Sequence, residues 1–326
     1  MPKPRSQQIS LSDTPYYHIL SRTVRKAFLC GVDEATGVNY EHRRDWIEAR
    51  IFELSQVFSI DICAYAVMHN HLHLVLHVDT AQVDNWSTIE LLSRWHQLYK
   101  GTHLTRKYQQ QQTLNEYERE IVEDTSNIYK QRLMDISWFM RSLNEPIARQ
   151  ANKEDECRGH FWEGRFQSQA LLDEGALLSC MAYVDLNPVR AAIAPTPEQS
   201  DFTSIQLRIK AAIKGTQPKA LLPFVGNEQQ DRITGICFSL QDYLTLVDET
   251  GRILREDKRG AINSETTAIL TRLHISDESW LKLTTNFEGI FTGAAGSAEH
   301  LCAFTEHVGL QRAHGLANAK ACLNSA

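Results

Sequence analysis

The first part of the chain alternates between strand-like and helix-like patterns of apolar residues. "PYYHILSRT" (15–23) has the composition of a strand, and "EHRRDWIEARIFELSQVF" (41–58) spaces its apolar residues as an amphipathic helix does. "SIDICAYAVMHNHLHLVLHVD" (59–79) is again rich in strand-forming residues. The order strand, helix, strand, strand predicts the start of an antiparallel α+β sandwich of ferredoxin-like type.

The pattern then becomes helical, and we expect a helical insertion over residues 85–150. "GHFWEGRFQSQALL" (159–172) predicts a further strand after a turn. "DEGALLSCMAYVDLNPVRAAI" (173–193) predicts a helix, which Pro188 should end at or near Asn187 because the residue before a proline disfavours the α conformation.

Beyond this helix the signal weakens, and a Pro- and Gly-bearing connection indicates a boundary near residue 215. We therefore expect one domain over 1–215 and a helical C-terminal extension over 216–326, in which we find no motif. The fold class expected is α+β, with a ferredoxin-like antiparallel sheet, packed helices, the helical insertion and the helical extension.

Composition narrows the function classes. With 42% hydrophobic residues in 326 the chain can bury a large core, and it has neither a membrane-spanning run nor the apolar core of a signal peptide, so we expect a cytoplasmic protein. Its seven cysteines are scattered singly, which suggests neither a disulfide framework nor a thiolate zinc site. The net charge of -6 argues against a protein that coats nucleic acid, so any such contact needs a local basic face.

The stretch "YAVMHNHLHLVLHV" (65–78) reads as a buried strand, yet it carries histidines at every second position. Strand side chains alternate, so the histidines should share one face and the leucines the other. The shared face would hold His69, His71, His73 and His77. Two histidines at i and i+2 can chelate one divalent cation. Ordinary half-exposed positions with hydrogen bonds explain the same spacing, so it leaves both interpretations open.

A second group lies on the predicted helix "MAYVDLNPVRA". Tyr183 and Asn187 are spaced i, i+4 and should project from one face. A tyrosine beside an amide oxygen that can act as a further metal ligand suits a metal-assisted attack on a phosphodiester. Taken alone, a tyrosine in such a helix is more often a residue at the edge of the core.

Together these motifs resemble a known family. "HLH" after "YAVMHN", followed by "GHFWEGRFQSQAL" and "YVDLNPVRA", is similar to the HUH single-tyrosine transposases, in particular the REP-associated branch related to small insertion-sequence transposases. The resemblance covers roughly residues 16–192. His69 departs from the family pattern, which more usually has proline or a small residue there, and His77 adds a further imidazole. Either histidine therefore remains an alternative ligand.

The resemblance implies a metal-dependent tyrosine transposase. His71 and His73 would bind the metal, Asn187 would complete its site, and Tyr183 would form a 5′-phosphotyrosine. The substrate would be single-stranded DNA with a hairpin such as a REP palindrome, cut and rejoined with Mg²⁺ or Mn²⁺. The alternative is a non-catalytic, host-adopted DNA- or RNA-binding regulator on the same fold. The sequence leaves open whether the protein is a monomer or a homodimer.

Candidate DNA contacts are basic residues, since charges are rarely buried. They are Arg22, Arg25, Lys26, Arg165 and Arg190. Aromatic residues alternate with arginines in "RGHFWEGRF" (158–166), a mixture that can stack bases. An aromatic-rich segment of this kind is more often part of a core.

Overall fold

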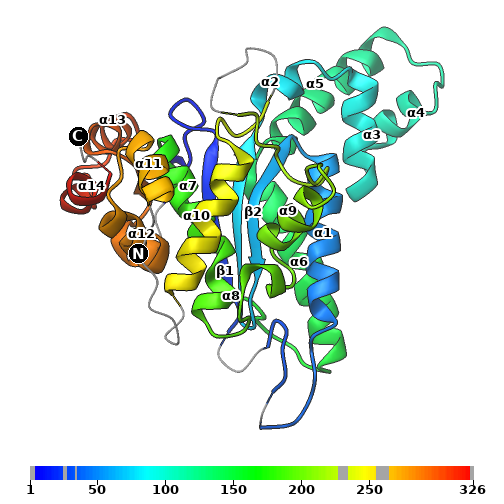
Figure 1. Ribbon diagram of the computed structural model, residues 1–326. Coiled ribbons are helices and arrows are strands. Elements are labelled where there is room, and N and C mark those ends of the chain that lie inside the picture. The colour runs from blue at the N-terminus through cyan, green and yellow to red at the C-terminus, as the bar shows by residue number, and fades with distance from the viewer. Residues whose placement is uncertain (1–3, 25–27, 34, 227–233, 255–263, 324–326) are drawn as a thin grey trace. The chain divides into compact units, whose positions relative to one another are not determined.

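The computed structural model describes the chain except residues 1–3, 25–27, 34, 227–233, 255–263 and 324–326 (Figure 1). Its centre is a five-stranded sheet in the order β2-β3-β1-β4-β5. The strands are β1 (Tyr16–Arg22), β2 (Ile60–Val67), β3 (His71–Val78), β4 (Gln167–Leu171) and β5 (Ala294–Ala295). β1 runs antiparallel to both β3 and β4, whereas β5 runs parallel to β4. The order of the first four strands is that of a ferredoxin-like sheet and confirms the predicted α+β class.

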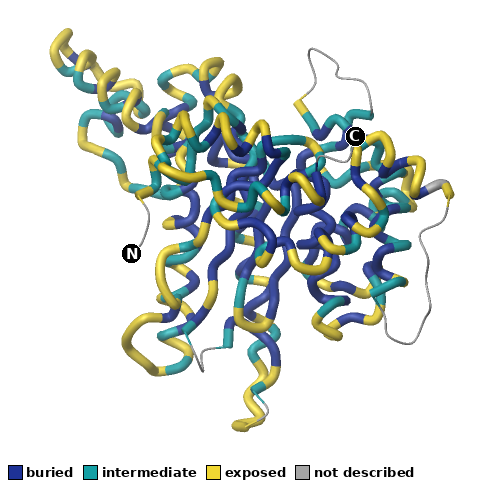
Figure 2. The backbone as a smooth tube through the Cα atoms, turned by 90° about the vertical axis from the view of Figure 1, so that its left-hand side faces the viewer, coloured by how far each residue is buried: buried dark blue, intermediate teal, exposed yellow. Residues whose placement is uncertain are grey.

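The histidine-bearing stretch is a hairpin rather than one strand. β2 ends at Val67, β3 begins at His71, and the Met68 N–H donates to the His71 carbonyl across the turn at 2.9 Å. His69 lies in this turn, so the expectation that it shares a strand face with His71 is wrong. The sheet strands are buried along most of their length (Figure 2), and the polar residues His18, His73 and Gln169 are among the buried ones.

The tyrosine-bearing segment forms two helices, α7 (Glu174–Asp185) and α8 (Asn187–Arg190), separated by Leu186. The Asp173 side chain caps α7 by accepting from the Ala176 N–H at 2.8 Å. Pro188 lies in the first turn of α8, where its missing N–H leaves no hydrogen bond unmade. The predicted end of the helix is therefore right to within two residues, but Tyr183 and Asn187 belong to different helices.

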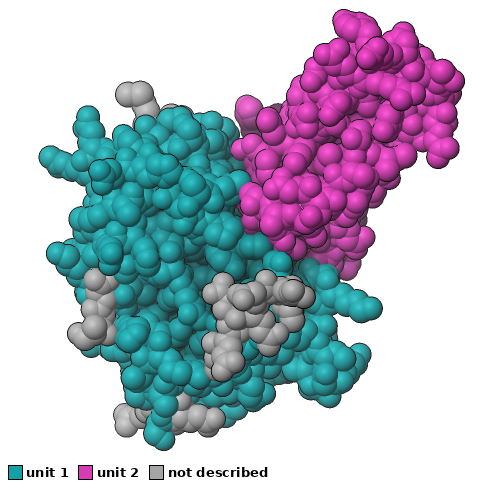
Figure 3. All heavy atoms as spheres, turned by 90° about the horizontal axis from the view of Figure 1, so that it is seen from above, with its two compact units in different colours: residues 1–44, 62–77, 163–326 teal, residues 45–61, 78–162 magenta. Residues whose placement is uncertain are grey.

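The predicted helical insertion is confirmed. The predicted range 85–150 contains α3 (Thr88–Leu98), α4 (His103–Gln109), α5 (Glu116–Leu133) and most of α6 (Ile136–Glu154), and α2 (Thr80–Asp84) precedes it. Residues 78–162 and 45–61, which include most of α1 (Arg43–Val57), form one compact unit (Figure 3). Inside this unit the Trp95 ring stacks on Tyr99 and Tyr129 at 4.4 and 4.5 Å between centroids, so aromatic packing joins α3 to α5.

The other compact unit holds residues 1–44, 62–77 and 163–326. After α8, its helices are the 3₁₀ turn Pro197–Gln199, α9 (Ser204–Ala212), α10 (Leu240–Ile253), α11 (Ser264–Arg272), α12 (Asp277–Ile290), α13 (Ala298–His307) and α14 (Leu316–Cys322); a short 3₁₀ turn, Arg5–Gln7, precedes β1. The C-terminal segment is helical as predicted, and it also contributes β5 to the sheet. None of the described helices is long and apolar enough to cross a membrane.

A buried carboxylate connects three helices of this unit. Asp185, at the end of α7, accepts hydrogen bonds from the Ser204 hydroxyl, the Ile205 N–H at 2.9 Å and the Tyr243 hydroxyl at 2.5 Å. Ser204 and Ile205 begin α9, and Tyr243 lies in α10. The C-terminal helix α10 is thus fastened to the end of the tyrosine helix α7.

Candidate active site

Five polar residues lie on one face of the sheet. Arg22 of β1 lies opposite His71 of β3, and His18 of β1 lies opposite Gln169 of β4. Residues directly opposite each other share a face, and so do residues two apart along a strand, which places His73 on this face as well. The predicted polar surroundings of the histidines are therefore built from three adjacent strands.

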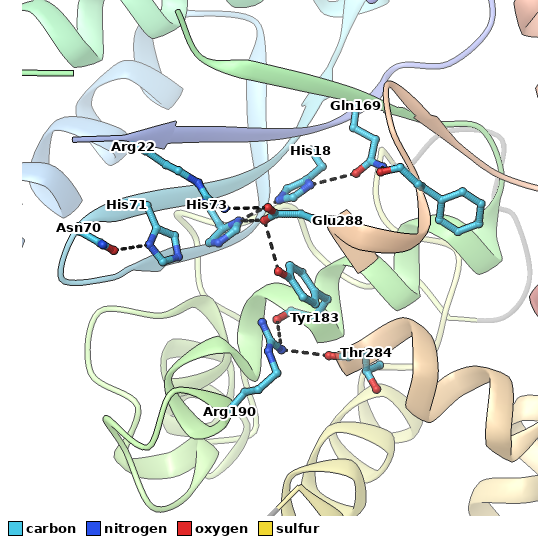
Figure 4. Close-up of polar contacts among 11 residues, drawn as sticks. His18, Arg22, Asn70, His71, His73, Gln169, Tyr183, Arg190, Thr284 and Glu288 are labelled. Carbon is cyan, nitrogen blue, oxygen red and sulfur yellow. Dashed lines mark hydrogen bonds and ion pairs between the residues drawn. The ribbon is translucent and has the colours of Figure 1, made fainter. Parts of the chain in front are cut away.

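Two helices bring further groups onto this face. Tyr183 comes from α7 and Glu288 from α12, and both point toward the histidines (Figure 4). The Tyr183 hydroxyl donates to Glu288 Oε1 at 3.3 Å, and the tyrosine ring lies edge-on to His73, with centroids 5.8 Å apart. Tyr183 is only 9% exposed, because α12 packs against α7 and Phe287 lies beside the tyrosine ring.

The two inner histidines and the carboxylate have converging donor atoms. His18 Nε2 lies 3.0 Å from His73 Nδ1, and their rings stack at an interplanar angle of 6°. His73 Nδ1 in turn lies 3.5 Å from Glu288 Oε1. One donor atom from each of the three residues lies within 4.8 Å of the other two. A cluster of two imidazoles and one carboxylate is a donor set that a divalent transition-metal ion fits.

Burial sets the charge states in the cluster. It lowers the pKa of His18 and places that of His73 well below the usual value, so both rings are neutral at pH 7. Burial, and then the charge of Arg22, lowers the pKa of His71 to about 4. Burial, and then the negative charge of Glu288, raises the pKa of Tyr183 to about 12. The tyrosine therefore holds its proton until a base accepts it.

Two of the predicted DNA-contact arginines lie at this site. The Arg22 guanidinium forms an ion pair with Glu288 Oε2 at 3.0 Å, and its side chain is 48% exposed. The Arg190 guanidinium lies 4.1 Å from the centroid of the Tyr183 ring and donates to the carbonyls of Tyr183 and Thr284. Arg190 is thus packed against the tyrosine, whereas Arg22 faces solvent in part.

Of the remaining residues of the predicted metal site, the structure places His71 beside His73. The His71 ring centroid is 4.8 Å from that of His73, and its Nδ1 lies 2.7 Å from the Asn70 side-chain oxygen. Among the described residues, the converging set contains His73 without His71. Asn187 is buried at the start of α8. The structure therefore brings His71, His73 and Tyr183 together, and it adds His18 and Glu288.

The structure describes two of the other sequence candidates, Arg165 and His77. Arg165 is exposed. The Arg5 guanidinium packs over the ring of the adjacent residue, Phe166, with its carbon 3.6 Å from the ring centroid. His77 packs on Tyr16 at the opposite end of β3, with ring centroids 4.9 Å apart. Arg25 and Lys26 lie outside the described residues.

A cavity of about 930 Å³ opens beside His71. Its lining includes Arg22, Phe28, His69, Asn70 and His71. The His69 carbonyl accepts from the N–H groups of Leu29 and Cys30, so the turn that ends in His71 is attached to the loop after β1. The cavity gives this end of the polar face room for a ligand the size of a nucleotide or larger.

We expect Gly31→Ala to disturb this cavity wall. Gly31 has φ +94°, and an added Cβ would lie 2.8 Å from Cδ2 of the His69 ring, so backbone strain and a clash act together. Urea unfolding should show a loss of about 2 kcal/mol. Gly37→Ala is the matched control, because Gly37 has φ +73° and open space around it, and it should lose about 1 kcal/mol. Equal losses would contradict the contact with His69.

Sequence reasoning missed two members of the cluster, His18 and Glu288, and also Gln169, which contacts His18. His18 is a polar residue among the apolar residues of β1, a signal that can be noticed in the sequence, whereas Gln169 belongs to a strand with three polar residues and does not stand out. Glu288 follows Tyr183 by 105 residues and belongs to a segment without any motif. No local pattern distinguishes it from the other carboxylates of the C-terminal helices.

Comparison with known proteins shows one distant likeness. No family model and no curated protein sequence matches the chain. A solved structure described as the REP-associated tyrosine transposase bound to a REP hairpin is similar, with 12% sequence identity and a TM-score of 0.38. The match covers 73% of this chain and 100% of the other. At this distance the likeness assigns neither a family nor an activity to the chain.

Proposed function

We propose that this protein is a DNA transposase or endonuclease that cleaves and rejoins hairpin-bearing single-stranded DNA through Tyr183. One observation carries the proposal: the Tyr183 hydroxyl donates to a carboxylate beside two neutral, buried imidazoles. A nucleophile, a proton acceptor and a metal-binding donor set are the parts that phosphodiester transfer to a tyrosine requires. The sequence motifs that resemble the HUH single-tyrosine transposases place the same tyrosine and the histidine His73 in these roles.

The chain's own residues account for the covalent step. The Tyr183 oxygen forms a bond to phosphorus, and the bond from phosphorus to the 3′ oxygen breaks. The 3′ oxygen takes a proton from solvent and leaves as a hydroxyl, and the 5′ phosphate remains on the tyrosine. Glu288 Oε1 already accepts the hydroxyl hydrogen and is the acceptor for the proton. Because the phosphotyrosine retains the energy of the phosphodiester, a second DNA hydroxyl can displace Tyr183 without nucleotide hydrolysis.

A divalent cation, Mg²⁺ or Mn²⁺, would polarise the scissile phosphate and offset its charge when bound. Two donor sets are candidates for holding it. One is the set implied by the sequence resemblance, His71, His73 and Asn187. The other is the converging set, His18, His73 and Glu288. His73 belongs to both.

The DNA would approach from the side of the cavity beside His71. Arg22 lies both at the cavity and at the cluster, where it can contact a phosphate once Glu288 has another partner. Arg190 holds the tyrosine ring by packing on it. Arg165, Arg25 and Lys26 remain proposed contacts to the DNA backbone.

The proposal is tested with labelled single-stranded hairpin DNA taken from the flanks of the protein's own gene. We expect the full-length protein to form a covalent adduct with Mn²⁺ and none with EDTA, as resolved on denaturing gels. The same DNA annealed to its complement is the control and should give little adduct. Hairpin binding without an adduct would instead favour the non-catalytic regulator, and absence of binding would reject both.

A further inference from the structure

We infer that His18, His73 and Glu288 form a divalent-cation site, in which α12 of the C-terminal segment supplies the carboxylate. The inference rests on the proposed function for its purpose, because the ion would act beside Tyr183. It assigns two ligands, His18 and Glu288, that the sequence motifs do not contain. It also makes the C-terminal segment a structural part of the reaction centre.

The distances within the cluster suit one ion. Ligand atoms about 2.1 Å from a cation stand about 3.0 Å apart at right angles and about 3.4 Å apart at tetrahedral angles. His18 Nε2 and His73 Nδ1 are 3.0 Å apart, and His73 Nδ1 and Glu288 Oε1 are 3.5 Å apart. Two of the three pairs therefore have the spacing of adjacent ligands, and the atoms of the third pair lie within 4.8 Å of each other, so side-chain shifts would bring all three onto one ion.

Hydrogen bonds outside the cluster orient His18 as a ligand. The Gln169 amide donates from Nε2 to the Phe291 carbonyl at 2.8 Å, which leaves Gln169 Oε1 as an acceptor facing His18 Nδ1 at 3.2 Å. His18 therefore carries its hydrogen on Nδ1 and turns the lone pair of Nε2 toward His73. A carbonyl oxygen that holds the distal N–H of an imidazole is the usual partner of a metal-bound histidine.

The 3.0 Å contact between the rings of His18 and His73 needs one hydrogen between them. With the lone pair of His18 Nε2 directed inward, the 3.0 Å contact requires the hydrogen to sit on His73 Nδ1. When His73 instead carries its hydrogen on Nε2, three acceptor atoms face one another, an arrangement that is stable only around a cation. Glu288 Oε1 has a second lone pair and can keep the hydrogen bond from Tyr183 at the same time.

The chemistry of the donors selects among ions. Imidazole nitrogen favours transition-metal ions, whereas Mg²⁺ prefers oxygen ligands and retains its waters. A set of two imidazole nitrogens and one carboxylate oxygen therefore favours Mn²⁺ over Mg²⁺. Both histidines are buried. Arg22 pairs with the other oxygen, Oε2, so it does not compete for the oxygen that faces the histidines.

The test measures Mn²⁺ binding to the full-length protein without DNA, by the electron paramagnetic resonance signal of free Mn²⁺ and by the metal-induced rise in melting temperature. Glu288→Gln keeps the shape of the side chain and should weaken Mn²⁺ affinity at least about tenfold, as should His18→Gln. Glu278→Gln, an exposed charge change on the same helix, is the matched control and should bind Mn²⁺ as the unmodified protein does. Asn187→Ala removes a ligand of the other candidate set and should also retain Mn²⁺ affinity.

Unchanged affinity in Glu288→Gln, or a tenfold loss in Asn187→Ala, would overturn the site, and so would the absence of Mn²⁺ binding to the folded protein. The rise in melting temperature on adding metal is measured against each variant's own metal-free melting temperature. A change in the stability of the metal-free variant therefore does not affect the comparison. Adduct formation with hairpin DNA is scored separately. If Glu288→Gln leaves the Mn²⁺ affinity unchanged and the unmodified protein still forms the adduct, this metal site is rejected and the proposed function is retained.

Discussion

Replacing Tyr183 with phenylalanine should abolish the covalent protein–DNA adduct, a loss of at least about 1,000-fold, and should leave hairpin binding unchanged. Phenylalanine keeps the ring contacts with His73 and Phe287 and the packing under the Arg190 guanidinium. Only the hydroxyl and its hydrogen bond to Glu288 are lost, so stability should change by about 1 kcal/mol or less. Adduct yield on denaturing gels and hairpin affinity by filter binding measure the two properties separately.

Tyr17→Phe is the matched control for this variant. Tyr17 is a fully buried tyrosine on β1, the strand that carries His18. Its hydroxyl forms hydrogen bonds with the backbone N–H and carbonyl of Ser10. Its loss should leave the adduct intact. An adduct that persists in Tyr183→Phe would show that another residue is the nucleophile, and loss of the adduct in both variants would show a general disturbance of the sheet.

Asp185→Ala should have the largest effect on stability. The substitution removes the acceptor of the Ser204 and Tyr243 hydroxyls and leaves the buried Arg208 guanidinium without its nearby negative charge. Removal of one member of such a buried network costs about 3 kcal/mol or more, a large share of the stability of a typical domain. Urea unfolding followed by circular dichroism near pH 7.5 measures the loss.

The loss should also depend on pH. Burial raises the pKa of Asp185 to about 6, and hydrogen bonds from Ser204 and Tyr243 limit the rise. Because this pKa lies above the unfolded value of about 3.9, the proton-linked part of the contribution of Asp185 to stability is fully present below about pH 4 and is lost as the pH rises through about 6. The hydrogen bonds and the charge beside Arg208 still contribute above that pH. The deficit of Asp185→Ala should therefore be about 2 kcal/mol larger near pH 4.5 than near pH 7.5.

Asp248→Ala serves as the control for both measurements. Asp248 lies on α10, the helix that carries Tyr243, and pairs with Arg252 at the surface at 2.8 Å. An exposed pair of this kind contributes less than about 1 kcal/mol. A deficit in Asp185→Ala that is equally small, or that grows as the pH rises, would contradict the role assigned to the buried carboxylate.

Local patterns in the sequence were enough to predict the main elements of the sheet and its helices. Alternation of apolar residues predicts the strands, and the position of Pro188 predicts the end of α7, because both depend on residues only a few positions apart. The closeness of His71 and His73 follows in the same way from their spacing on one strand. The alternation of apolar residues does not predict where the hairpin turns. The backbone hydrogen bonds that end β2 and begin β3 place His69 in the turn.

The composition of the reaction centre depended on tertiary structure. His18 and Gln169 meet His73 because of the registers of β1 with β3 and β4, which are set by packing across the sheet and not by the sequence near the histidines. Glu288 reaches Tyr183 across 105 residues because α12 packs on α7. The sequence by itself determined which elements form and which histidines are neighbours. Only the folded chain decided which carboxylate faces them, since convergence of distant side chains is a property of long-range packing.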